Sequence, residues 1–202
     1  MYTKLAHAIS YLLHPFLIPT YLMLIVLYFR TAFINYPMGI KFYLLWVVIL
    51  FTLIIPMLVL MVLRSIGRID NYRVATREER ILPLLIGGIC YMLCAWMIIK
   101  IPSAALLSKM MIAAAICELF ALIVTLRWQI SLHLTAMGAA TALLAVLTLA
   151  GVGNLMVVLA LAIGCAGLLA SSRLYLGRHD GLQIFAGFGG GFVVTTLTLL
   201  FF

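Results

Sequence analysis

Long apolar runs, separated by short polar segments, are the feature that most restricts how this chain can fold. They lie at about residues 5–29, 42–63, 82–99, 106–126, 132–150, 154–171 and 182–202. A helix needs about 20 apolar residues to cross the hydrocarbon core of a bilayer, where each backbone polar group must be bonded within its own segment. The pattern predicts an all-α integral membrane protein with about seven transmembrane helices, packed as one domain over residues 1–202.

Two details leave a bundle of six helices as an alternative. The run at 82–99 is the shortest, and Lys109 interrupts the start of the run that follows it. The first run comes directly after Lys4 and contains no small-residue cleavage site before Arg30. We therefore expect a retained first helix and not a removed signal peptide.

The composition excludes a soluble domain and argues against a nucleic-acid partner. The chain is 67% hydrophobic and 9% charged, whereas soluble domains have about 25% charged residues. Its net charge is +8, but the basic residues lie next to the apolar runs, which favours anionic headgroups or phosphate-bearing substrates. All four cysteines fall within apolar runs and are expected to be small apolar side chains, not disulfides or zinc ligands. No metal or other cofactor is expected.

The most charged segment runs from Arg64 to Arg80, between the second and third apolar runs. It contains five of the thirteen Lys and Arg residues and three of the five Asp and Glu residues. A helix from about Asn71 would place Arg73, Arg77 and Arg80 on one face, at positions i, i+4 and i+7. That face can bind a phosphate; a basic anchor at the membrane surface is the alternative.

A second polar pair, Ser131 and His133, opens the fifth apolar run. A histidine can act as an acid or a base near neutral pH, and the serine hydroxyl can add a hydrogen-bond donor. The alternative is an interfacial histidine whose helix is capped by Ser131. Both interpretations place the pair at the start of a helix.

The third polar segment separates the sixth and seventh runs and contains Arg173 and His179. The guanidinium of an arginine has five fixed donors and a permanent charge, which suits a phosphate, and a histidine can serve as a nucleophile. Gln183 lies one helical turn after His179, so its side chain can reach the imidazole. Asp180 and Gln183 also have the spacing of a helix-capping pair, with Asp180 as the N-cap.

A seven-helix topology brings all three polar segments to one side of the membrane, because each pair of helices returns the chain to the same face. That side would carry nine Lys and Arg residues and the opposite side four. The positive-inside rule then predicts that the three segments face the cytoplasm.

In their order along the chain, these segments resemble the three signatures of the type 2 phosphatidic acid phosphatase superfamily. The resemblance covers about residues 64–191. It rests on Arg73 and Arg80 for the first signature, Ser131 and His133 for the second, and Ser172, Arg173 and His179 for the third. The sequence departs from the pattern at Gln183, where the family has an aspartate, and at Ile130 and Leu132, where it has a proline and a glycine. In the first signature Arg73 replaces a lysine, and the proline is displaced to Pro83.

The resemblance implies a metal-independent phosphatase that acts on a lipid phosphate or isoprenoid diphosphate, in a membrane expected to be the bacterial inner membrane. His179 would attack phosphorus and form a phosphohistidine, His133 would protonate the leaving group, and Arg173 would stabilise the phosphoryl oxygens. Further substrate contacts are expected from Arg73, Arg77, Arg80 and Ser131, with Gln183 or Asp180 orienting His179.

Two other functions remain open. The departures at Gln183, Ile130 and Leu132 favour a lipid-binding or assembly protein of the same fold that has little or no catalytic activity. A small transporter is the second alternative, with Glu118 and His14 as its titratable groups inside the membrane. A prenyltransferase is disfavoured because Asp70 and Asp180 are isolated, whereas magnesium diphosphate needs clustered carboxylates.

Overall fold

The computed structural model describes residues 2–72, 74 and 76–201, and within them the protein is built from helices. In chain order these are α1 (Tyr2–Leu12), α2 (Ile18–Tyr28), α3 (Met38–Ile49), the π-helical segment Leu50–Ile54, α4 (Ile55–Ser65), α5 (Arg77–Ile98), the short 3-10 helix Pro102–Ala104, α6 (Ala105–Thr125), α7 (Leu132–Leu149), α8 (Met156–Tyr175) and α9 (Gly181–Phe201). The predicted all-α membrane fold is confirmed.

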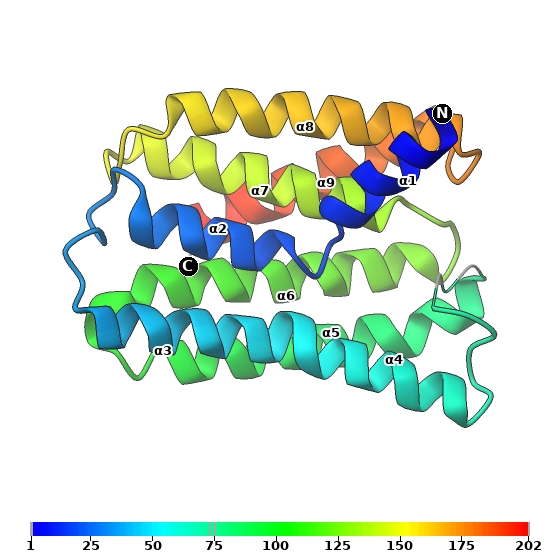
Figure 1. Cartoon of the computed structure of the whole chain (residues 1–202), viewed down its shortest axis with the longest axis horizontal. Helices are drawn as coiled ribbons and strands as arrows, with labels where there is room; N and C mark the ends of the chain where they lie inside the picture. Colours follow the sequence, from blue (N-terminus) through cyan, green and yellow to red (C-terminus); the bar gives the residue numbers. More distant parts are fainter. Residues whose placement is uncertain (1, 73, 75, 202) are drawn as a thin grey trace.

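Among the described residues, six helical segments are long and apolar enough to cross a membrane. They are Met38–Ser65, Arg77–Ile98, Pro102–Thr125, Leu132–Leu149, Met156–Tyr175 and Gly181–Phe201. They match the second to seventh predicted runs, and Figure 1 shows them side by side along the long axis of the bundle. The first of them is one continuous helix formed by α3, the π-helical segment and α4.

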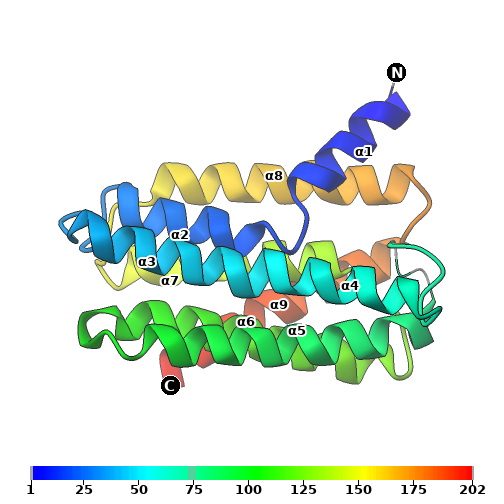
Figure 2. The ribbon, with the colours of Figure 1, turned by 60° about the horizontal axis from the view of Figure 1, so that its bottom comes forward.

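The first predicted run, 5–29, is not one helix, and this part of the prediction is wrong. The chain leaves helical structure after Leu12 and resumes it at Ile18. Pro15 cannot donate a backbone hydrogen bond and its ring clashes with the preceding turn, so the helix is broken here. Figure 2 shows α1 projecting from the bundle at an angle, while α2 lies among the other helices.

The turns of the bundle fall into two groups at its opposite ends. One group joins α4 to α5, α6 to α7 and α8 to α9, and all three turns lie at the end where the N-terminus is found (Figure 1). We call this the site end. The other group, which joins α2 to α3, α5 to α6 and α7 to α8, lies at the opposite end (Figure 1), which we call the closed end. The three polar segments therefore share one end of the bundle, as their predicted topology requires.

The closed end contains the largest apolar core. The residues at its centre come from five different helices and are buried: Met23, Leu27, Leu44, Ile98, Leu107, Met111 and Leu144. Burial of each such side chain is worth about 1.5–3 kcal/mol relative to leaving it exposed to water. In a bilayer that gain shrinks, and close van der Waals packing becomes the main stabilising term.

Helices α7 and α9 approach each other closely because glycines line their contact. A Cβ atom on Gly191 would overlap the backbone carbonyl group of Thr135, and one on Gly138 would overlap that of Phe188. Farther along, a Cβ on Gly187 would lie 2.7 Å from the Ser131 carbonyl oxygen. These small residues fix the start of α7 against the start of α9, which brings the second and third polar segments together.

The first polar segment departs from its predicted helix. Helix α5 begins at Arg77, not near Asn71, because Thr76 is its N-cap. The Thr76 side chain accepts a hydrogen bond from the Glu79 N–H at 3.3 Å, and the Glu79 carboxylate accepts one from the Thr76 N–H at 3.2 Å. This capping box ends any helix that would come from upstream. Arg73 lies outside the described residues.

Candidate functional site

Two of the cavities at the site end adjoin each other. The inner one, about 120 Å³, is lined by residues from every polar segment, including Arg80, His133, Arg173 and His179. The outer one, about 190 Å³, contains His7, Gln129 and Arg178 instead of His179. Five residues line both cavities, namely His14, Tyr72, Arg80, His133 and Arg173. Four of the predicted site residues therefore converge on a space large enough for one phosphate.

His179 is held in one orientation by Gln183. His179 lies just before α9 and Gln183 lies in the first turn of that helix. The Nδ1 atom of His179 is 2.8 Å from the Oε1 atom of Gln183. Because an amide oxygen only accepts hydrogen bonds, Nδ1 carries the proton in this arrangement. The Nε2 atom of His179 then has a free lone pair, which is the form that a nucleophile requires.

The same glutamine also caps helix α9. The Gln183 N–H donates to the Asp180 carboxylate at 2.7 Å, and the Asp180 N–H donates to Gln183 Oε1 at 3.4 Å. The predicted capping pair is thus present, with Asp180 as N-cap. Asp180 is exposed and bonds the backbone. Of the two predicted orienting residues, Gln183 is the one that contacts His179.

The environment of His179 keeps its imidazole neutral. Burial lowers the pKa of His179 from 6.5 to about 4; the hydrogen bond to Gln183 opposes this shift, and the positive charges of Arg173 and Arg80 add to it. His179 is only 7% exposed. At neutral pH the ring is therefore uncharged, and a bound phosphate would offset the two arginines.

Arg173 carries donors that the protein leaves unused. It lies in the last turn of α8 and lines both cavities. Its Nε–H is buried, and no described residue accepts a hydrogen bond from it. An unpaired donor in a buried site costs about 1–3 kcal/mol, more on a charged group. An anion in the cavity would remove that cost.

Arg80 reaches the same cavities from the first turn of α5. Its Nε donates to the carbonyl of Val74 at 3.0 Å and its Nη1 to the carbonyl of Ile130 at 3.4 Å. These contacts tie the first polar segment to the second. They involve neutral carbonyls, so the charge of Arg80 is not neutralised by them.

His133 lies in the first turn of α7 and bonds to helix α1. Its Nε2 atom is 3.2 Å from the carbonyl oxygen of Ser10. A carbonyl oxygen only accepts, so Nε2–H is used by this contact. Donation of a proton to a leaving group would thus require a proton on Nδ1 as well. The bond also fastens α1 over the site end.

Two predicted substrate contacts lie away from the cavities. Ser131 is fully buried where α7 meets α9, its N–H donates to the Gln183 carbonyl at 3.2 Å, and its hydroxyl has no described partner. Arg77 is exposed and donates to the carbonyl of Arg127 at 2.9 Å. Arg77 instead lines a separate cavity, together with Arg127 and Gln183.

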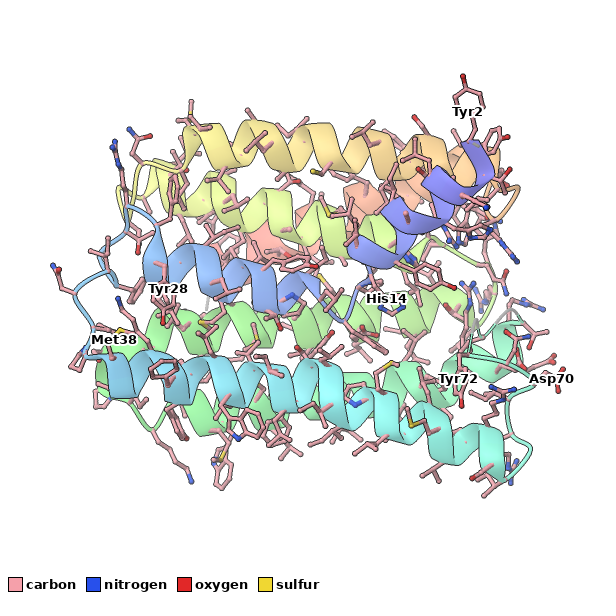
Figure 3. All side chains as sticks on the ribbon, in the orientation of Figure 1. Tyr2, His14, Tyr28, Met38, Asp70 and Tyr72 are labelled. Carbon is pink, nitrogen blue, oxygen red and sulfur yellow. The ribbon has the colours of Figure 1, made fainter. Side chains whose placement is uncertain are left out.

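Three residues around the inner cavity were not predicted as site residues. His14, in the break between α1 and α2, has its ring 5.3 Å from that of His133. Figure 3 shows His14 and Tyr72 in the half of the bundle nearer the site end. Glu118 of α6 also lines the inner cavity, with its carboxyl group against Gly87. The signals for His14 and Glu118 were present as polar residues within apolar runs.

The inner cavity continues toward the apolar interior. A third cavity of about 70 Å³ shares Pro15, Glu118 and Leu132 with it and is otherwise lined mainly by apolar side chains of α2, α6 and α7. Among residues 2–72, 74 and 76–201, no three His, Cys, Asp or Glu side chains converge as metal ligands. The inner cavity, which is cationic and rich in imidazoles, adjoins the third cavity, which is apolar.

Comparison of the chain with protein families, with curated proteins and with solved structures finds no match. The resemblance to the phosphatase superfamily therefore stays a prediction that rests on its motifs.

Proposed function

We propose that this protein is a membrane phosphatase that hydrolyses a lipid phosphate or diphosphate through a phosphohistidine intermediate. One observation carries the proposal. The His179 imidazole is oriented by Gln183 with its Nε2 lone pair free, in a cavity that it shares with Arg173, Arg80 and His133. A neutral, oriented nucleophile beside unneutralised cations is what metal-independent phosphoryl transfer needs.

The reaction has two steps. His179 Nε2 attacks phosphorus, the P–N bond forms, and the bond from phosphorus to the lipid oxygen breaks, while Arg173 and Arg80 stabilise the phosphoryl oxygens. Water then attacks the phosphohistidine and releases inorganic phosphate. The leaving oxygen takes its proton from His133 when Nδ1 of that ring is protonated, or from the substrate itself when a monoanion binds.

The third, apolar cavity shares Glu118 with the inner cavity and lies within the helices. Its position beside the inner cavity supports a lipid as the substrate class. The bacterial inner membrane is the proposed location. The site end carries most of the basic residues, which favours a cytoplasmic orientation of the site.

Phosphate release by the purified protein from phosphatidic acid and from an isoprenoid diphosphate would test the proposal. The parent protein should release phosphate, and brief incubation with substrate labelled in its phosphate should leave an acid-labile label on the protein. His179→Ala should abolish both signals. His7→Ala is the matched control, because His7 lines only the outer cavity. Equal turnover in His179→Ala would contradict the proposed nucleophile.

A lipid-binding protein without turnover is the second candidate. The observation that favours it is the hydrogen bond from His133 to Ser10, which occupies the proton that an acid catalyst would donate. In that case the parent binds lipid phosphates but releases no phosphate, and His179→Ala leaves binding unchanged.

A further inference from the structure

His14, the third imidazole that lines the inner cavity, has no role in the mechanism above. It lies in the break between α1 and α2 and lines both the inner and the outer cavity. Its ring packs edge-to-face on that of His133, with the two centroids 5.3 Å apart. In Figure 3 its side chain leaves the chain at the point where α1 turns into α2. The break caused by Pro15 therefore places an imidazole where a continuous helix would not.

A backbone hydrogen bond decides which nitrogen of His14 carries the proton. The Phe16 N–H donates to His14 Nδ1 at 3.3 Å. A backbone N–H can only donate, so Nδ1 presents a lone pair and the single proton of the neutral ring is on Nε2. Arg173 lines the same two cavities, and a nearby cation favours the neutral form of an imidazole.

The three imidazoles thus present different groups to the cavity. His179 uses its N–H to bind Gln183 and keeps a lone pair. His133 uses its Nε2–H to bind the Ser10 carbonyl. His14 accepts a hydrogen bond from the backbone, and none of the described residues accepts one from its Nε2–H. Of the three rings, His14 is the one whose proton is left for a ligand.

We propose that His14 is a further catalytic residue, which donates a hydrogen bond from its neutral ring to an oxygen of a bound phosphoryl group. This role rests on the proposed phosphatase function. The proton stays on His14 throughout, because removing it would leave an imidazolate. His14 therefore acts as a fixed donor, in the same way as a backbone N–H, and stabilises the charge that develops on the phosphoryl or leaving oxygen.

Two variants separate the hydrogen-bond donor from the ring. His14→Phe keeps an aromatic ring but has no N–H, whereas His14→Gln keeps an N–H near the position of Nε2 and cannot titrate. We expect kcat/KM to fall about 10- to 100-fold in His14→Phe, the range for a hydrogen bond to a charged group, and to stay within a few-fold of the parent in His14→Gln. His7→Phe, at the outer cavity only, is the control. Equal losses in both variants, at unchanged thermal stability, would overturn the donor role.

Binding of inorganic phosphate tests His14 independently of turnover. In the parent with 15N-labelled histidine, phosphate should shift the Nε2–H resonance of His14 while Nδ1 stays unprotonated, and His14→Gln assigns that resonance. A His14 signal that phosphate leaves unchanged would overturn the inference even if His14→Phe does not fold. If phosphate moves the signal but the parent releases none from lipid phosphates, the proposed turnover fails and the donor role stands.

Discussion

The two ends of the bundle use their polar groups in opposite ways. At the closed end, the buried Lys41 ammonium donates to the Ile34 carbonyl at 2.6 Å and lies 4.7 Å from the centre of the Tyr28 ring. Thr31 donates to the Val26 carbonyl there, and its backbone forms an isolated bridge with Gly153. These polar groups make their contacts within the protein and hold the segments of the closed end together.

At the site end, polar groups remain available. The Arg173 Nε–H has no described acceptor, and His179 keeps a free lone pair. The two ends thus differ in whether a buried cation stabilises the fold or is free to bind an anion. A buried cation that is satisfied by carbonyls and an aromatic face stabilises the fold, whereas one with unused donors beside a cavity is prepared for an anion.

Paired substitutions of Arg173 and Lys41 give the largest expected difference. Arg173→Met should lower kcat about 10²- to 10³-fold, as loss of a donor to a developing anion does, with little change in thermal stability. Lys41→Met should leave kcat unchanged and lower stability by about 1.5–3 kcal/mol, the range for a hydrogen bond from a charged group. Phosphate release and thermal unfolding in detergent would measure the two effects. A strong loss of stability in Arg173→Met would show that Arg173 is structural too.

A second pair of substitutions tests whether helix packing sets the site. Gly191→Ala places a methyl group on the Thr135 carbonyl, whereas Gly189→Ala, on the same helix, meets nothing within 4 Å. The first should cost about 1–3 kcal/mol of stability through overpacking and should lower activity up to about 100-fold, because a small displacement of catalytic groups is costly. The second should match the parent. Equal behaviour of the two variants would disprove the close α7–α9 contact.

The smallest expected effect concerns the group that orients His179. Gln183→Asp should raise kcat by roughly tenfold, since a carboxylate both fixes the tautomer and stabilises the cationic ring that forms. It should also raise the pKa of His179 from about 4. Because the nucleophile must be neutral, the acid limb of kcat/KM would move from near pH 4 toward neutral pH.

Gln183→Leu is the matching control, because it removes the acceptor without adding charge. Stability gives a second measurement. The pKa of His179 is lower in the folded protein than its ordinary 6.5, so its contribution is constant above about pH 6.5 and is lost as the pH falls toward 4. Gln183→Asp should reduce that loss. A rate unchanged in Gln183→Asp, together with full loss in Asp180→Asn, would make Asp180 the orienting residue.

Much of the fold follows from hydropathy. Apolar runs predicted six of the helices and the end at which their polar turns meet, because a bilayer leaves few other arrangements for segments of that length. The spacing of His179 and Gln183 predicted that the two side chains can meet, and they do, although His179 lies just before α9 and not within it. Local periodicity was enough in both cases.

The rest depended on interactions between distant segments. Pro15 gave a signal for a kink, but a full break requires that His133 and Ser10 hold α1 in another direction. Thr76 and Glu79 form a capping box, which competes with a helix from Asn71 and starts α5 at Arg77. The burial of Ser131 came from the approach of α9, which no pattern near Ser131 indicates.

Gln183 both positions the imidazole of His179 and forms the reciprocal cap of α9 with Asp180. A ligand that draws His179 toward phosphorus must pull on the same amide that closes the first turn of the helix. We therefore expect a ligand bound in the cavity to increase fraying of that turn. Backbone hydrogen–deuterium exchange at Asp180 and Gln183 would then report whether the cavity is occupied. This measurement needs no knowledge of the natural lipid, so it can screen a library of headgroups before any substrate is known.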